Sequence, residues 1–140
     1  MTINYICSKH QFSAPPPSGS SGLTNRPWVE VTATVGSKSR RVYCLLDTGA
    51  DDTMLDLGTA TALGIIPAHL PRRVTVRFGG GSGAGSTFGL LPLTQLEFAG
   101  TVVHVDVLFG NVALPLLGRS AFLASSGLDI GFDQVQWKHT

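Results

Sequence analysis

The triplet Asp47-Thr48-Gly49 is the part of the sequence whose residue types and spacing could do chemistry. It follows an apolar run from Tyr43 to Leu46, so we expect a strand that leaves a core and a sharp turn at the triplet. Such a turn points the Asp47 carboxylate into a cleft rather than into bulk water. Because a carboxylate is energetically costly in that setting, Asp47 is the candidate catalytic residue.

A single carboxylate activates water poorly near neutral pH, so hydrolysis by acid–base catalysis with aspartate needs two carboxylates. Two carboxylates in contact hold one proton between them, so one can deprotonate a water molecule while the other protonates a carbonyl oxygen. The chain has one Asp-Thr-Gly or Asp-Ser-Gly triplet, since Asp106, Asp129 and Asp133 lack the following hydroxyl and glycine. The second carboxylate most simply comes from a second chain, and we therefore predict a homodimer that brings Asp47 against its symmetry mate.

Three segments of the chain resemble parts of the retropepsins, the retroviral-type aspartic proteases that work as homodimers, and they follow one another in the same order as in that family. The run 45–53 resembles the active-site turn of that family. The run 115–119 resembles its apolar-apolar-Gly-Arg signature, and the run 78–88 lies where the family has a glycine-rich flap. Together they cover the chain from about residue 28 to residue 138, and three elements in order are a specific signal.

The resemblance implies roles for the residues of the active-site turn. Thr48 would join the two turns of the dimer through hydrogen bonds across the twofold axis. Gly49 would offer its carbonyl group to the backbone of a peptide substrate, and Ala50 would complete the turn. The reaction needs no cofactor, and the substrate would be an extended polypeptide.

The resemblance also implies roles for charged residues around the turn. Asp51 would pair with Arg119, which follows Gly118, and this contact would brace the turn near the dimer interface. Asp51 and Asp52 are also the expected substrate-binding acids. The alternative for both acids is a solvated turn without a binding role.

The glycine-rich segment is the expected flap, a lid that closes over the substrate and excludes water. Its candidate substrate contacts are Gly80, Gly81, Ser82 and Gly83. A mobile loop without contacts is the simpler alternative. A nucleotide-binding loop is disfavoured, because the phosphate-loop lysine is missing and no helix start follows.

The elements that position these residues are mainly strands. Alternating apolar residues predict strands over 28–35 and 101–109, and a hairpin from the first of these leads into the Asp47 turn. Asp56 can cap a short helix over 57–63, and we expect a second helix over residues 119–126. We therefore predict an all-β fold, a closed antiparallel β-barrel of the retropepsin (acid protease) type with one or two short helices.

Length and composition limit the remaining possibilities. The 140 residues suit one folded domain over 26–140, preceded by a flexible arm with a Pro/Ser/Gly linker over 1–25. Ten basic and nine acidic residues give a net charge of +1, so we predict neither a nucleic-acid nor a membrane partner. No basic start with an apolar run indicates a signal peptide, and we expect a soluble, cytoplasmic protein.

No metal site is expected either. Cys7 and Cys44 have no metal-ligand spacing, and the acids that follow Asp47 fail the calcium-loop pattern. The sequence therefore predicts an aspartic endopeptidase that activates water between the two Asp47 carboxylates of a homodimer. The alternative is a non-catalytic module of the same fold, which would dimerise and bind extended peptides without cutting them.

Overall fold

The computed structural model describes residues 2–4, 6–11, 23–47, 49–77, 85–124, 131–133 and 136–138. Thr48 of the predicted active-site turn lies outside the described residues. So do Gly80, Gly81, Ser82 and Gly83 of the predicted flap, together with residues 12–22 of the predicted linker.

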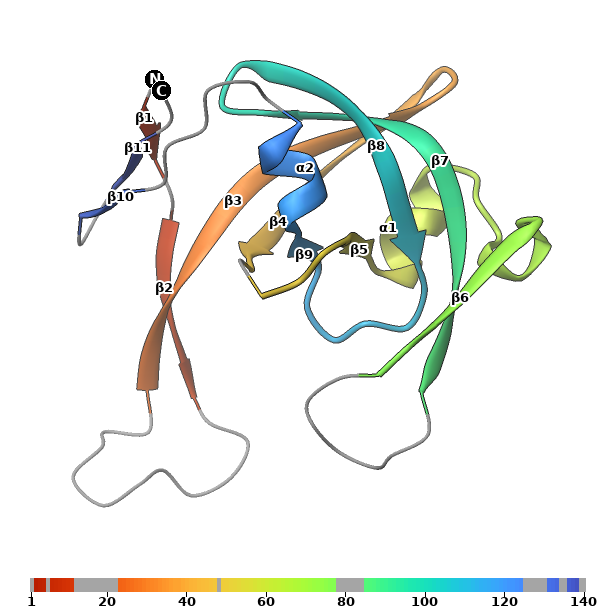
Figure 1. Cartoon of the computed structure of the whole chain (residues 1–140), viewed down its shortest axis with the longest axis horizontal. Helices are drawn as coiled ribbons and strands as arrows, with labels where there is room; N and C mark the ends of the chain where they lie inside the picture. Colours follow the sequence, from red (N-terminus) through yellow and green to blue (C-terminus); the bar gives the residue numbers. More distant parts are fainter. Residues whose placement is uncertain are drawn as a thin grey trace.

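Most of the described chain is β-strand (Figure 1). The larger sheet has the strands β2 (Ile6–Gln11), β3 (Leu23–Val35), β4 (Lys38–Leu46), β5 (Thr53–Leu55), β6 (Arg72–Val76), β7 (Ser86–Phe98), β8 (Thr101–Phe109) and β9 (Leu116–Leu117). A smaller sheet joins β1 (Thr2–Asn4), β11 (Gln136–Lys138) and β10 (Gly131–Asp133), so that strands from the two ends of the chain lie side by side.

Within the described residues the larger sheet has eight strands in the order β2-β3-β4-β9-β5-β8-β7-β6. An additional pairing between β3 and β7 closes a ring of hydrogen-bonded strands through β3, β4, β9, β5, β8 and β7. We call this closed path the strand ring. It leaves β2 and β6 as the two outer strands of the sheet.

The prediction of a mainly β fold with two short helices is confirmed, but the sheet is mixed. β4 pairs with β9 and β5 pairs with β8 in parallel, so the expected antiparallel arrangement is wrong at these two places. Tight turns can join only antiparallel neighbours. β9 and β5 are instead short strands that reach their parallel partners through longer connections, which local sequence patterns do not reveal.

The helices among the described residues are short. Helix α1 (Leu57–Ala62) begins after Asp56, whose side chain accepts a hydrogen bond from the Thr59 backbone, as the capping prediction required. The 3₁₀ helix η1 (Pro67–His69) follows, and α2 (Arg119–Leu123) begins directly after Gly118. Neither α1 nor α2 approaches the length and apolar character that a bilayer crossing requires.

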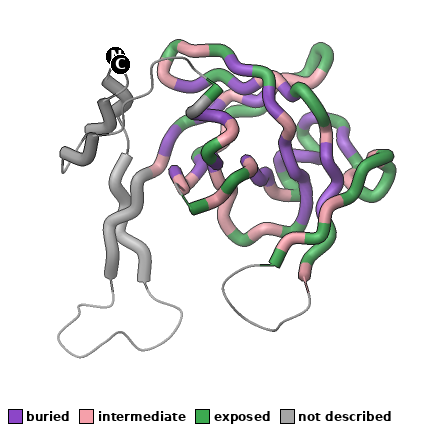
Figure 2. The backbone as a smooth tube through the Cα atoms, viewed as in Figure 1, coloured by how far each residue is buried: buried purple, intermediate pink, exposed green. Residues whose placement is uncertain are grey.

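The hydrophobic core lies inside the strand ring (Figure 2). On β3 the predicted apolar face is correct, because Val29, Val31 and Ala33 are all buried. β3 itself begins at Leu23, five residues before the expected start, and its first residues pair with β2. A second apolar cluster, with Met54, Phe88, Leu90 and Leu108, lies under β6.

Cys44 on β4 belongs to this core and is completely buried. Burial, with a smaller contribution from the charge of Asp56, raises the pKa of the Cys44 thiol from 9.0 to about 12. The thiol therefore stays protonated in the folded chain, where it packs as a small apolar group.

This burial predicts a specific loss of stability in alkaline solution. Between pH 9.0 and about 12 the unfolded Cys44 thiol loses its proton while the folded one keeps it, so the free energy of unfolding falls as the pH rises. Urea denaturation of the wild-type chain and of Cys44→Ala across this range measures the effect. The decline should be steeper in the wild type, and parallel declines would contradict the assignment.

Candidate active site

The strand β4 carries Asp47 to its place, and β9 holds the end of that strand. Leu45 and Leu46 of β4 lie beside Leu116 and Leu117 in parallel register. The Asp47 backbone N–H donates to the Leu117 carbonyl at 3.1 Å. The apolar run before the triplet and the Pro-Leu-Leu-Gly segment therefore pair with each other, and together they hold the Asp47 backbone in place.

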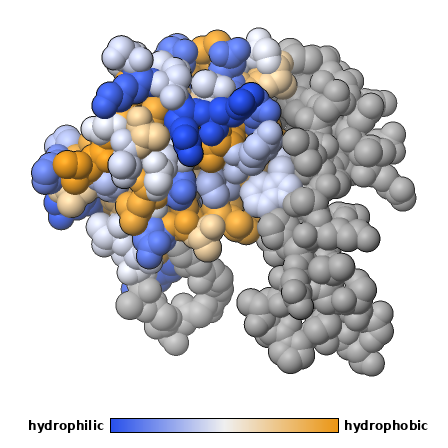
Figure 3. All heavy atoms as spheres, turned by 180° about the vertical axis from the view of Figure 1, so that it is seen from behind, coloured by the Kyte–Doolittle hydropathy of each residue, from blue (hydrophilic) through white to orange (hydrophobic). Residues whose placement is uncertain are grey.

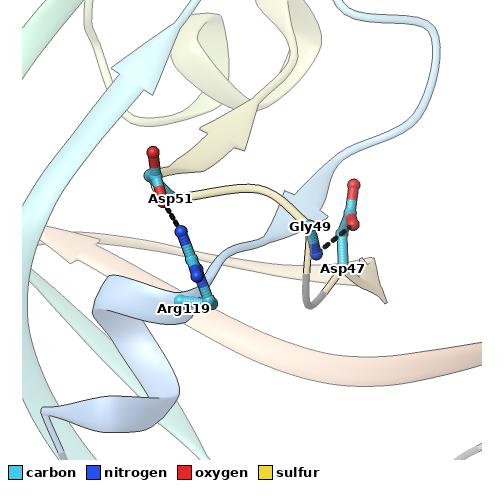
Figure 4. A network of polar contacts seen from close by, with 4 residues as sticks. All are labelled: Asp47, Gly49, Asp51 and Arg119. Atoms are coloured by element: carbon cyan, nitrogen blue, oxygen red, sulfur yellow. Dashed lines mark hydrogen bonds and ion pairs between the residues drawn. The ribbon is translucent and has the colours of Figure 1, made fainter. Parts of the chain in front are cut away.

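Backbone hydrogen bonds within the turn orient the Asp47 carboxylate (Figure 4). The Gly49 N–H donates to Asp47 Oδ1 at 2.9 Å, and the Ala50 N–H donates to the Asp47 carbonyl at 3.3 Å. Because the first bond uses one carboxylate oxygen, the other remains available to a ligand. The side chain is half-buried, at the boundary between the core and solvent.

The start of α2 braces the far side of the turn. The Arg119 guanidinium donates to the Asp51 carboxylate (Figure 4). Their side chains are 49% and 77% exposed, so water screens this ion pair and its contribution to stability is small. The backbone contributes more directly, since the N–H groups of Arg119 and Ser120 donate to the carbonyls of Ala50 and Asp51, each at 2.9 Å.

Gly118 permits this close approach. A Cβ atom at this position would overlap the backbone carbonyl of Asp52, so only glycine fits without a shift of the backbone. The Gly118 N–H donates to Thr53 Oγ1 at 3.1 Å, and both residues are buried. The Asp47 turn and the segment at Gly118 are therefore held together by direct backbone contact.

A pocket opens beside the Asp47 carboxylate. Five of the residues that line it were candidates from the sequence: Asp47, Gly49, Ala50, Asp51 and Asp52. Gly118 and Arg119 lie behind the turn rather than in the pocket. The expected contacts of Thr48 and of the four flap residues fall outside the described residues and stay predictions.

Four further lining residues were missed from the sequence: Met54, Val76, Arg77 and Leu116. Met54, Val76 and Leu116 give the pocket apolar walls, and Arg77 adds an exposed cation. Leu116 lies within the Pro-Leu-Leu-Gly segment, so that motif carried a usable signal. Met54 and Val76 lie on β5 and β6, and only the fold brings those strands to the turn.

The described residues around the pocket do not form a group of metal ligands. Among the described residues, histidine, cysteine and acidic side chains form no group of three or more that could hold a metal. Its polar groups are carboxylates and backbone amides, together with one guanidinium. These groups can orient a water molecule and a peptide, which is the chemistry of hydrolysis by paired acids.

The bracing contacts predict unequal effects of two substitutions. Gly118→Ala should lower the free energy of unfolding by about 1–3 kcal/mol, because the Asp52 backbone must move. Arg119→Gln should lower it by less than about 1 kcal/mol, because its ion pair is exposed. Urea denaturation measures both, with Gly58→Ala on the exposed surface of α1 as the glycine control. A larger loss in Arg119→Gln than in Gly118→Ala would contradict this account.

Comparison with known proteins identifies the family of this chain. A family model described as aspartyl protease matches residues 31–121, which is more than half of the chain. The matched segment runs from β3 into α2 and includes the Asp47 turn and the Gly118-Arg119 pair. The comparison with curated proteins gives no match. On the family match, the chain belongs to the aspartyl protease family, whose members are peptidases acting on polypeptides.

Proposed function

We propose that the chain is an aspartic endopeptidase that hydrolyses extended polypeptides as a homodimer. The observation that carries this proposal is the Asp47 carboxylate, which the Gly49 N–H orients beside a pocket inside the segment matched by the aspartyl protease family. Residues 26–140, which contain that segment, would be the protease domain, and residues 1–25 would precede it as an arm.

A second protomer would supply the second carboxylate. The chain contains one Asp-Thr-Gly triplet, and the neighbouring acid Asp51 is engaged by Arg119. Twofold symmetry would place the two Asp47 side chains against each other, and no other described acid lies on an equivalent turn. Thr48 would join the two turns across the axis.

The reaction then follows from one proton shared by two carboxylates. The ionised Asp47 takes a proton from water as the water oxygen attacks the scissile carbonyl carbon, and the protonated Asp47 gives its proton to the carbonyl oxygen. In the second step the C–N bond breaks as the protonated carboxyl gives its proton to the leaving amine, and a hydroxyl of the tetrahedral intermediate gives its proton to the other Asp47 carboxylate. The two carboxylates finish with one proton between them, ready for another water molecule.

The pocket beside Asp47 would hold a substrate side chain. Its walls of Ala50, Met54, Val76 and Leu116 suit an apolar group. Gly49 would bind the substrate backbone, with Asp51 and Asp52 at the edge of the pocket. Gly80, Gly81, Ser82 and Gly83 would cover the bound peptide from the flap.

Replacement of the Asp47 carboxylate tests the chemistry directly. Asp47→Asn keeps the shape of the side chain but removes the ionisable group, so kcat/KM should fall by at least about a hundredfold. A digest of a mixed peptide library, read by mass spectrometry with and without pepstatin, measures the loss. Asp106→Asn is the matched control, since it lies on β8 away from the pocket.

Equal cleavage by the wild type and Asp47→Asn would refute the proposal. Peptide binding by both without any cleavage would support the non-catalytic module instead. Either result would be interpreted only for variants that unfold at the wild-type urea midpoint.

A mixing experiment tests whether the two carboxylates come from two chains. When equal amounts of wild type and Asp47→Asn are unfolded and refolded together, about one quarter of the dimers should pair two wild-type chains. Activity per dimer should fall to that share, because mixed dimers carry one Asp47. Activity that stays at one half would indicate that each chain works alone.

A further inference from the structure

Acidic and basic residues are unevenly distributed along this chain, and the small net charge does not reveal this. No acidic residue occurs between Asp56 and Glu97, although the whole chain has a net charge of only +1. The same stretch contains Arg72, Arg73 and Arg77, and all three are exposed. The part of the molecule built from α1, η1, β6 and most of β7 is therefore positively charged.

A second pocket lies on this positive part of the molecule. It shares no lining residue with the Asp47 pocket. Leu57, Ile66, Pro67 and Phe88 give it apolar walls, and Arg73 lines it from β6. Leu57 and Ile66 are 47% and 56% exposed, so the pocket presents apolar surface to solvent. Figure 3 shows hydrophobic and hydrophilic residues next to each other on the side where α1 and η1 lie.

The strand β6 offers a free edge next to this pocket. It is the outermost strand of its sheet, and among the described residues it pairs only with β7 (Figure 1). Such an edge presents backbone N–H and C=O groups that can pair with an added strand. Its arginines oppose pairing with β6 of another copy, because like charges would meet.

The two faces of β6 have different uses. Val74 and Val76 pack against the second apolar cluster, and Val76 also lines the Asp47 pocket. Arg73 lies on the opposite face, where it pairs with Gly89 and lines the second pocket. Its guanidinium donates to the Ala68 carbonyl, which uses part of its donor capacity and leaves the other N–H groups for a ligand.

We propose that this surface, consisting of Leu57, Ile66, Arg73 and the free edge of β6, binds an extended acidic segment of a separate polypeptide. An apolar side chain of the segment enters the pocket, and carboxylates two residues before or after it, on the same face of the extended segment, pair with the Arg73 guanidinium. Arg72 and Arg73 on β6, together with the lack of acids from residue 57 to residue 96, favour a negatively charged ligand over a positively charged one. We call it the β6 docking surface. It is separate from the Asp47 pocket and does not depend on catalysis.

Binding of a designed peptide tests the β6 docking surface. The probe is fluorescein-labelled Glu-Ser-Leu-Ser-Glu, which has the same length as β6 and places its leucine and both carboxylates on one face when extended. Fluorescence anisotropy with full-length Asp47→Asn measures its affinity without any cleavage of the probe. We expect saturable binding that added salt weakens. The uncharged peptide Gln-Ser-Leu-Ser-Gln should bind at least about tenfold more weakly.

Two variants in the same background locate the peptide. Arg73→Gln should weaken binding by about fivefold, and Ile66→Ser by about tenfold, because they remove the charge and part of the apolar wall. Arg40→Gln on β4 and Val102→Ser on β8 are matched controls, exposed like the residues tested and remote from the pocket. Neither control should change the affinity.

Three results would overturn the proposal. The first is equal affinity for the acidic and the uncharged peptide, or no binding of either. The second is a loss in Arg40→Gln as large as that in Arg73→Gln, which would indicate non-specific attraction. The third is a larger loss in Arg77→Gln than in Arg73→Gln, which would place the peptide in the Asp47 pocket.

Discussion

The close approach of Gly118 to the Asp52 backbone is the contact on which the rest of the site depends. It brings the start of α2 against the Asp47 turn, so that the N–H groups of Arg119 and Ser120 reach the turn carbonyls. It also fixes β9 beside β4, and β9 accepts the hydrogen bond from the Asp47 backbone. A larger residue at position 118 would separate these elements, because its Cβ has no space.

The position of the Asp47 carboxylate is thus determined by backbone contacts rather than by charged side chains. Gly49 donates to Asp47, and the ladder between β4 and β9 holds the strand end. The Asp51–Arg119 ion pair is exposed and lies outside this framework. A site built in this way keeps its geometry when salt or pH changes the strength of surface charges, since backbone hydrogen bonds do not titrate.

Two groups of charged residues of opposite sign lie in different parts of the molecule. Acids gather at the turn between Asp47 and Asp56, and arginines gather at β6. β6 connects the two regions, since Val76 lines the Asp47 pocket while Arg73 lines the second pocket from the opposite face. A nearly neutral composition therefore hides two surfaces of different charge, and each of them is suited to a different polypeptide ligand.

The sequence by itself determined the turn at Asp47, the apolar face of β3 and the helix cap at Asp56, because apolar alternation and turn chemistry are encoded in consecutive residues. It also determined the candidates that line the pocket from the turn itself. Only the tertiary structure placed Met54 and Val76 beside Asp47 and paired β4 with β9 in parallel. Val76 and β9 lie far from Asp47 in the chain, and the positions of all these contacts depend on how the whole sheet closes rather than on any local pattern.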